Sequence, residues 1–328
     1  MTMRTNLFRL LFFLLAGVML SACEKPVLSE DEDSGKDNPS KPLKGNLILR
    51  VSGFEIIPFD NVTRTKQDLK DVCTSLCFAL YDQSDRKVAY KNQSASDSNF
   101  GQVGLELDKG TYQVVVVAHS GEGNPQMSTP AEVWFTNATG FTDTYYYYNA
   151  SVVVGDGQQS IDVVLEHAVA MFRLVTSDPV PDNVAKIRFN YTGGCGRLNA
   201  KTGLGTGVRS KQTVWFDISE SQKGKPITLE VYTFPNEEDG LLKMQINTYD
   251  ANENPLDEAV LDNVPIERNK ITVYTGYLFS DPPQGGGGEE PGGDEPGGET
   301  PVVDPTSASY VFPLKVETDW GGTIEKTF

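Results

Sequence analysis

Residues able to carry out catalysis are scarce in this chain. It has two histidines, His119 and His167, and four cysteines. No serine stands in a nucleophile-elbow motif such as G-x-S-x-G, and no pair of carboxylates can be assigned as acid and base. Both histidines are therefore expected to be structural or solvent-facing. The sequence predicts a protein that is not an enzyme and needs no cofactor or metal.

Cys23 is the cysteine with the clearest chemistry. Arg4 and Arg9 precede an uncharged apolar run, 10–20, which ends in Leu20-Ser21-Ala22-Cys23. A helix of that length crosses about half of a ~30 Å hydrocarbon core, so the run is typical of a signal peptide and too short for a membrane span. Its end resembles the bacterial lipobox, which implies cleavage between Ala22 and Cys23 and acylation of Cys23. The alternative is an ordinary signal peptide with a buried cysteine.

The other three cysteines, Cys73, Cys77 and Cys195, are expected to be small core residues. If Cys73 and Cys77 lie on one strand, their Cα atoms are about 13 Å apart, beyond the ~7 Å limit for a disulfide. The Cys73/Cys77 pair has no further His or Cys at the spacing of a zinc site, so it does not indicate one. Their redox state stays open.

The best candidate for a small-ligand site is the tyrosine run that follows Asp143. Tyr145 and Tyr147, together with Trp134, could form an aromatic platform for a glycan. Consecutive strand residues point to opposite faces, so at most two of the four tyrosines in 145–148 share a surface. The alternative is a strand whose tyrosines face a core.

Short apolar alternations separated by turn residues fill the chain from residue 45 onward. Turn residues such as Asp108-Lys109-Gly110 and Gly155-Asp156-Gly157 punctuate them. One short helix is expected near 64–72, and 202–207 and 250–258 are interpreted as a hairpin tip and a turn. The first series of expected strands is 46–53, 75–82, 87–92, 101–107, 111–119, 131–137, 145–154 and 160–167.

A second series follows with no Gly/Pro linker before it. Its expected strands are 168–176, 185–192, 212–219, 226–234, 243–250 and 269–279. Each series has the size of one β-sandwich. The sequence therefore predicts an all-β fold with an N-terminal sandwich at 45–166 and a C-terminal sandwich at 167–280.

Two segments outside the sandwiches lack the composition of a core. Residues 23–44 are predicted to be a flexible acidic tether, and 281–305, rich in Gly, Pro and acidic residues, a flexible linker. Strand-like alternation returns in the C-terminal segment 306–328. A lone strand is unstable in water, so this one must pair in its own chain or with another molecule. The candidate strand-pairing residues are Tyr310, Phe312, Leu314 and Val316.

Net charge limits the partners. The chain carries −17, and loss of Arg4 and Arg9 with the signal peptide, two positive charges, makes this −19. Such a balance opposes nucleic-acid binding, which needs clustered Lys and Arg. The acidic run 29–33 resembles the surface-export signal of Bacteroidetes lipoproteins, although a solvated linker would look the same. We expect a lipid-anchored protein that is exposed at the cell surface.

Three longer stretches carry a family resemblance: LEHAVAMFRLV (165–175), YTGGCGRLNAKTGLG (191–205) and VPIERNKITVYTGYLF (264–279). With the lipobox and the two sandwich-sized segments, they resemble the fimbrillin-associated anchor and accessory lipoproteins of Bacteroidales type V pili. His167, where members often carry Arg, and the long linker depart from the pattern. The resemblance implies two tandem transthyretin-like sandwiches held to the outer membrane through Cys23. It also implies fimbrial shaft or accessory subunits as partners, bound by β-strand addition.

The leading interpretation is thus a fimbrial anchor or accessory subunit at the base or tip of a pilus. The alternative is a glycan-binding surface lipoprotein that acts with a nutrient-uptake system and uses the Tyr145, Tyr147 and Trp134 platform.

Overall fold

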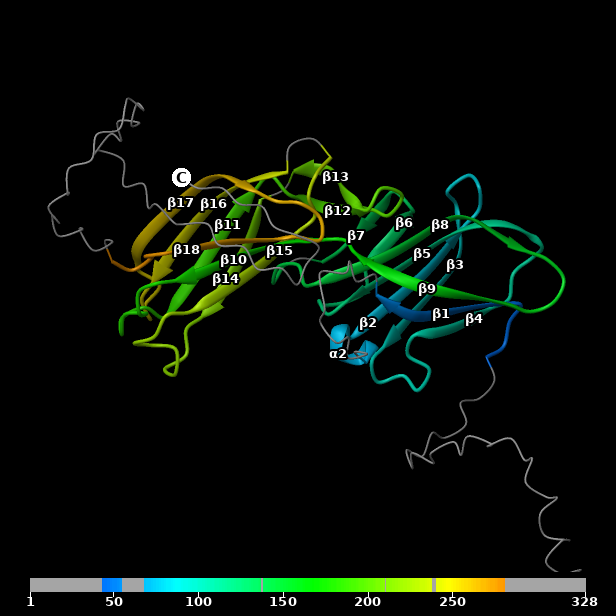
Figure 1. Ribbon diagram of the computed structural model, residues 1–328, viewed down its shortest axis with the longest axis horizontal. Helices are drawn as coiled ribbons and strands as arrows, with labels where there is room; N and C mark the ends of the chain where they lie inside the picture. The colour runs from blue at the N-terminus through cyan, green and yellow to red at the C-terminus, as the bar shows by residue number, and fades with distance from the viewer. Residues whose placement is uncertain (1–42, 55–67, 137, 210, 238–239, 281–328) are drawn as a thin grey trace, which may run out of the picture. The chain divides into compact units, whose positions relative to one another are not determined.

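The computed structural model describes residues 43–54, 68–136, 138–209, 211–237 and 240–280 of the 328-residue chain, and all of them fall within one compact unit. Their regular structure is almost entirely β-strand, as Figure 1 shows, and α2 (Leu69–Val72) is the one helix in these ranges. The all-β prediction is confirmed. The expected signal peptide, linker and C-terminal segment lie outside the described residues, as does the tether apart from residues 43 and 44.

The first sandwich has two layers. Its strands are β1 (Leu47–Phe54), β2 (Ser75–Tyr81), β3 (Lys87–Ser94), β4 (Gln102–Leu105), β5 (Gly110–His119), β8 (Thr144–Val154) and β9 (Gln159–His167). One layer has the order β3-β2-β5-β8 and the other β9-β1-β4. They join only at the start of β8, where Tyr145 pairs with His167 and Tyr146 with Glu166. The core between the layers includes Leu49, Phe78 and Val116.

Both faces of the β2-β5-β8 layer are buried. Val114 and Val116 of β5 face the core between the two layers, whereas Val115 and Val117 belong to a second apolar cluster on the opposite face. A strand covered on both sides has no polar face, which explains the continuous valine run 114–117.

A four-stranded sheet covers that opposite face and is built from both halves of the sequence. It has the order β13-β12-β7-β6, with β6 (Gln126–Thr129), β7 (Glu132–Trp134), β12 (Cys195–Asn199) and β13 (Leu204–Arg209). Val133 of β7 pairs with Leu198 of β12, and both are buried with Met127 and Phe234. Strand pairing therefore crosses the expected boundary at 166/167, and the division into domains stays a prediction.

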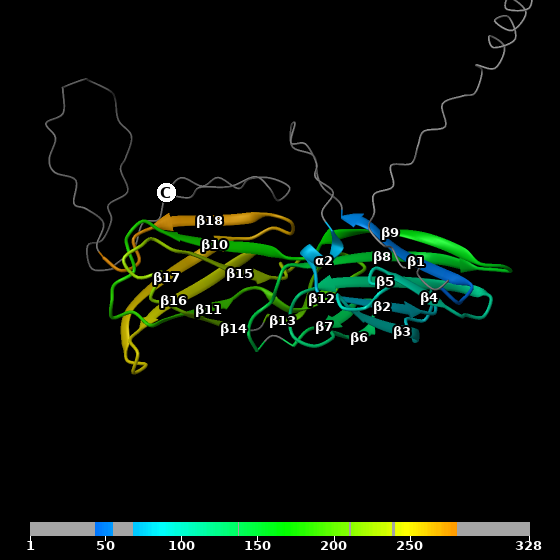
Figure 2. The ribbon, with the colours of Figure 1, turned by 90° about the horizontal axis from the view of Figure 1, so that it is seen from below.

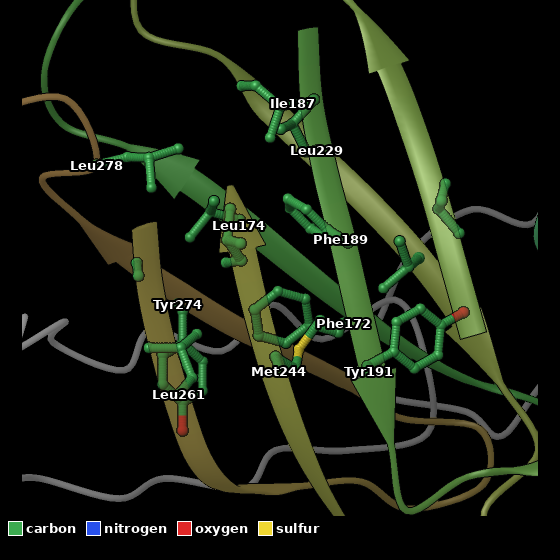
Figure 3. Close-up of a cluster of buried hydrophobic side chains, with 14 of the residues drawn as sticks. Phe172, Leu174, Ile187, Phe189, Tyr191, Leu229, Met244, Leu261, Tyr274 and Leu278 are labelled. Carbon is green, nitrogen blue, oxygen red and sulfur yellow. The ribbon is translucent and has the colours of Figure 1, made fainter. Parts of the chain in front are cut away.

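The second sandwich holds the remaining strands, β10 (Ala170–Thr176), β11 (Lys186–Thr192), β14 (Gln212–Asp217), β15 (Thr228–Thr233), β16 (Leu241–Tyr249), β17 (Pro255–Pro265) and β18 (Ile271–Gly276). A three-stranded layer, β15-β10-β18, faces a four-stranded layer, β14-β11-β16-β17, and Figure 2 shows the two layers from the side. Phe172, Phe189 and Met244 meet between them (Figure 3).

One parallel pair occurs in each sandwich. β1 runs parallel to β9, and β10 runs parallel to β18, whereas the other paired strands are antiparallel. In both cases the first strand of a sandwich lies beside its last. Each sandwich is thereby closed by the two ends of its own segment.

The structure contains four strands that the two expected series lack: β6, β12, β13 and β17. β17 runs through the second half of the stretch interpreted as a turn, so only 250–254 are a turn. Of the helix expected near 64–72, the described part is α2, capped by the Asp68 carboxylate, which accepts a hydrogen bond from the Lys70 N–H. β12 and β13 form a hairpin whose turn lies at 200–203, so of the tip expected at 202–207 residues 204–207 already belong to β13.

Candidate functional site

The outer edge of β18 is the candidate site. On its inner side the carbonyls of Lys270 and Gly276 accept hydrogen bonds from the N–H groups of Met171 and Ser177, at 3.1 and 2.6 Å. In a parallel ladder the backbone groups of alternate residues face the same neighbour. The N–H and C=O groups of Ile271, Val273 and Thr275 consequently face away from β10. No strand in the described part of the chain pairs with this side.

β18 differs from the other edge strands in its composition. Natural sheets protect their edges with charges, prolines, bulges or short strands. The edge strands β4 and β6 have four residues each. The longer edge strands β3, β13, β14, β15 and β17 each contain a charged residue, and β17 begins at Pro255 and ends at Pro265. β18, with the sequence ITVYTG, has neither charge nor proline. Among the described edges longer than four residues, it alone lacks these protective features.

The two layers of the second sandwich are unequal beside this edge. β17 is the last strand of the four-stranded layer and leads through residues 266–270 into β18, so the two strands lie at the same side of the sandwich. In Figure 3, Leu261 of β17 and Tyr274 of β18 lie next to each other at this side of the core. The Tyr274 ring centroid is 5.5 Å from that of Phe172, and burial raises the pKa of Tyr274. One further strand would make the layers equal.

A buried carboxylate fixes the chain directly after β18. Asp178, 4 % exposed, accepts hydrogen bonds from the N–H groups of Leu278 and Phe279, at 3.0 and 2.7 Å, and from the Ser280 hydroxyl at 3.1 Å. Hydrogen bonds to a carboxylate are about twice as strong as those between neutral groups. The exit of the chain from the sandwich is therefore held in a defined place beside the edge.

The site residues expected at both ends of the chain are not among the described residues. These are Ala22 and Cys23 for cleavage and lipid attachment, and Tyr310, Phe312, Leu314 and Val316 for strand pairing. Their roles stay predictions.

The structure does not assemble the expected glycan platform. Tyr145 is 7 % exposed, its ring lies 4.2 Å from that of His167, and its hydroxyl donates to Asp143 at 2.8 Å. Tyr147 is half-buried against the core of the first sandwich. Trp134 is 51 % exposed but belongs to the sheet on the opposite face of β8. β8 is covered on both faces, so Tyr145 and Tyr146 are buried and Tyr147 and Tyr148 are partly buried against the two clusters.

The cysteines and histidines have structural surroundings. Cys73, Cys77 and Cys195 are buried, and none forms a disulfide within the described ranges. Burial raises the pKa of the Cys73 and Cys77 thiols to about 12, which keeps them protonated and unreactive. His119 is 2 % exposed, and His167 Nε2 lies 3.4 Å from Asp143 Oδ1. The expectation that these are structural residues is confirmed for the three cysteines and for His119.

The described residues contain no cluster of three or more His, Cys, Asp or Glu side chains that could hold a metal ion. In the same ranges, none of the helical structure has the length and apolar character needed to cross a bilayer.

Sequence reasoning did not single out β18. It was recognised as a strand, but its position at an edge depends on which strands pair. Its lack of charge and proline over 271–276 is the one signal that could have drawn attention to it.

One family model matches most of the chain. Residues 55–297 match the model of a family described as "Family of unknown function (DUF6562)". No curated protein matches the chain.

Several solved structures are similar to the chain. A proposed polysaccharide-binding protein (DUF1812) from Bacteroides thetaiotaomicron is 10% identical with a TM-score of 0.47, over 72% of this chain and 92% of that one. A proposed adhesin from Bacteroides ovatus is 16% identical with a TM-score of 0.46, over 74% and 90%. The fimbrial anchor protein Mfa2 from Porphyromonas gingivalis is 11% identical with a TM-score of 0.40, over 70% and 89%. The expected resemblance to fimbrial proteins is thus present among solved structures.

Proposed function

The chain belongs to the DUF6562 family, a family of unknown function, and we propose that it is an anchor or accessory subunit of a fimbria that binds other subunits by β-strand addition. The observation that carries the proposal is the β18 edge, which has free pairing capacity in the described chain and none of the protective features of the other long edges. No catalysis is involved in this function.

Strand addition would use the backbone of β18 directly. The six N–H and C=O groups of Ile271, Val273 and Thr275 can each form one hydrogen bond with an added strand. At about 1 kcal/mol each, these bonds contribute several kcal/mol, and alternate side chains of the added strand supply specificity by entering pockets. The three-stranded layer then has four strands, like the layer opposite.

The candidate added strand is the segment with Tyr310, Phe312, Leu314 and Val316, from this chain or from a neighbouring subunit. A flexible linker of about 25 residues has an average span of about 28 Å, and six strand residues cover about 20 Å, so the segment can return to β18 in the same chain. Pro313 within this segment restricts it to an edge position, because proline cannot donate to a further strand. We place pairing within the chain first and donation to a neighbour second.

The proposal also includes a location. Lipidation at Cys23 would tie the protein to the outer membrane, and at about 0.8 kcal/mol per buried CH₂ two or more acyl chains give a stable anchor. An acidic tether at 23–44 would then hold the sandwiches away from the membrane. The subunit would then either join the pilus to the cell or terminate the pilus.

A deletion tests the edge. Removing residues 305–328 is expected to lower the melting temperature by about 5–10 °C if the segment pairs within the chain, and a synthetic peptide of residues 306–318 should restore it. Val273→Pro removes an N–H at the outer edge and keeps the ladder to β10, so in this variant neither the deletion nor the peptide should matter. Thermal unfolding, monitored by circular dichroism, measures the melting temperature of each chain with and without the peptide.

Donation to a neighbour gives a different result. The deletion then leaves the melting temperature unchanged, and fimbrial polymer copurifies with the full chain from envelope fractions but not with the deletion or with Val273→Pro. If peptide binding and copurification are both absent in the full chain, or are unaffected by Val273→Pro, the proposal is wrong.

A further inference from the structure

The outer face of the β14-β11-β16-β17 layer carries an ordered row of side chains. Trp215 pairs across the strands with Arg188, Arg188 with Asn247, and Asn247 with Glu258. The inward residues of these strands, such as Phe189 and Ile246, fill the core, so the row lies on the face turned away from it. One aromatic, one cationic, one amide and one acidic side chain thus follow one another over four strands.

Hydrogen bonds fix this row and the next one. The Arg188 Nη2 donates to Asn247 Oδ1 at 2.9 Å, and Asn247 Nδ2 donates to Glu258 Oε2 at 2.8 Å. Gln245 Nε2 donates to the same Glu258 oxygen at 2.9 Å. In the second row, Thr213 donates to Asn190 Oδ1 at 2.8 Å. The planar polar groups are therefore preorganised. Asn190 and Asn247 are nearly buried, whereas Gln245 is partly exposed and Glu258 is exposed, so these two can reach a ligand.

Aromatic rings border the polar groups. Trp215 is 48 % exposed, and its ring centroid is 5.1 Å from that of Tyr249. The Arg188 guanidinium carbon lies 5.3 Å from the Trp215 centroid and 5.0 Å from the Tyr249 centroid. This contact holds the indole in place while about half of its surface stays in solvent. Arg188 Nε is buried and has no hydrogen-bond partner among the described residues.

Most charges on this face are paired, and the exposed carboxylate of Asp217 lies opposite Lys186 across the strands. Lys186 pairs with Glu253 at 2.7 Å and Lys243 with Asp262 at 2.9 Å. Arg188 and Glu258 are connected through Asn247. No concentrated positive or negative field is left to attract a polyanion or a polycation, so the face suits an uncharged ligand.

We propose that this face binds a neutral polysaccharide. The exposed indole of Trp215 stacks on the apolar face of a sugar ring, and the side chains of Gln245 and Glu258 bind hydroxyl groups, while the nearly buried Asn247 holds Glu258 in place. Aromatic groups with one face in solvent favour such flat, amphipathic partners. Small free ligands favour concave pockets, whereas an open sheet face fits an extended chain that crosses several strands. The site is separate from the β18 edge and does not depend on strand addition.

Trp134 offers a matched control. It too is an exposed tryptophan with an arginine against it, since Arg197 lies 5.2 Å from its ring centroid. That arginine is paired with Glu132 at 3.0 Å, and the cross-strand row holds Gln126 and Thr206 but no second aromatic. It has the aromatic surface without the row of amides.

The experiment is affinity electrophoresis of the full chain in gels that contain galactomannan, xyloglucan, α-mannan or hydroxyethyl cellulose, followed by calorimetry with the best binder. Trp215→Ala is expected to weaken binding about tenfold or more, Trp215→Tyr to keep most of it, and Gln245→Ala to weaken it less. Trp134→Ala and Val273→Pro should bind like the unchanged chain. Circular dichroism confirms that each variant is folded.

The proposal is overturned by any of three results. The unchanged chain fails to bind every polysaccharide in the panel, or Trp215→Ala binds as well as the unchanged chain, or Trp134→Ala loses binding to the same extent. Retention of binding in Val273→Pro separates this site from the edge of β18.

Discussion

The carboxylate of Asp178 accepts a hydrogen bond from the backbone N–H of Phe279 at 2.7 Å, although the two residues are 101 positions apart. With Leu278 and Ser280 on the same carboxylate, this contact fastens the end of the second sandwich to the loop that follows β10. The buried Asp178 carboxylate accepts all three hydrogen bonds, which makes it hard to replace.

Asp178→Ala should therefore destabilise the protein by about 2–3 kcal/mol, because three donors lose their acceptor and two of them belong to the backbone. Urea unfolding measures the change. Asp182→Ala, which removes an exposed carboxylate from the same loop, is the control and should change the free energy of unfolding by less than about 0.5 kcal/mol. Equal effects of the two changes would contradict this role.

His119 should make stability depend on pH. Burial lowers its pKa from 6.5 to about 4, its Nδ1 accepts from the Gly121 N–H at 3.1 Å, and its Nε2 has no partner in the described ranges. Between these two pKa values the unfolded state binds the proton and the folded state does not, so stability falls as the pH drops from about 6.5 towards 4.

The expected loss attributable to His119 is about 2 kcal/mol between pH 7 and pH 4.5. Urea unfolding at the two pH values measures it, with His119→Leu as the comparison, because carboxylates contribute in both chains. The variant should lose about 2 kcal/mol less over this range. Parallel pH profiles would show that His119 is not responsible.

Arg268 should stabilise the contact between the two halves of the chain. Its Nη1 donates to the Tyr146 hydroxyl, to Glu166 Oε2 and to the His167 carbonyl, at 3.1, 3.0 and 3.1 Å. Because the side chain is partly exposed, Arg268→Ala should cost about 1–2 kcal/mol, less than a fully buried ion pair. Lys270→Ala removes a cation whose ion-pair partner among the described residues is the nearby Glu267, and should cost less. A larger effect at Lys270 would refute the assignment.

Cys23→Ser should prevent lipidation. The variant is expected as an uncleaved or soluble species, because the thiol is the acyl acceptor in the lipobox chemistry that the sequence resembles. Detergent phase partitioning and mass spectrometry of the mature N-terminus test this. Partitioning identical to that of the unchanged chain, or an unmodified N-terminus in the mature protein, would contradict it.

The sequence predicts those strands best that have one polar and one buried face. In β11, Ile187, Phe189 and Tyr191 are buried, while Lys186 and Arg188 lie on the outer face, as the alternation indicates. β17 is absent from the expected strands, because its exposed Asp257 and Glu258 and the preceding turn at 250–254 look alike in composition. An exposed acidic edge strand resembles a loop when only its polarity is read.

Pairing between distant strands could not be predicted at all. The partnership of β7 with β12 and the covering of β8 on both faces depend on contacts across the whole chain. For that reason the sequence leaves both a surface and a core open for the tyrosines of 145–148, and it gives no sign of the row from Trp215 to Glu258. Its members come from four separate strands and meet only when the register of the sheet is known.

The parallel pairs, β1 with β9 and β10 with β18, have a mechanical consequence. In each pair the chain enters at the start of one strand and leaves at the end of the other. Tension applied through the two termini therefore pulls the partners along their length, in shear, and loads all the ladder bonds together. Antiparallel neighbours pulled at one end would unzip bond by bond under much smaller forces. A body that connects a cell to a filament exposed to flow would need that resistance in both of its sandwiches.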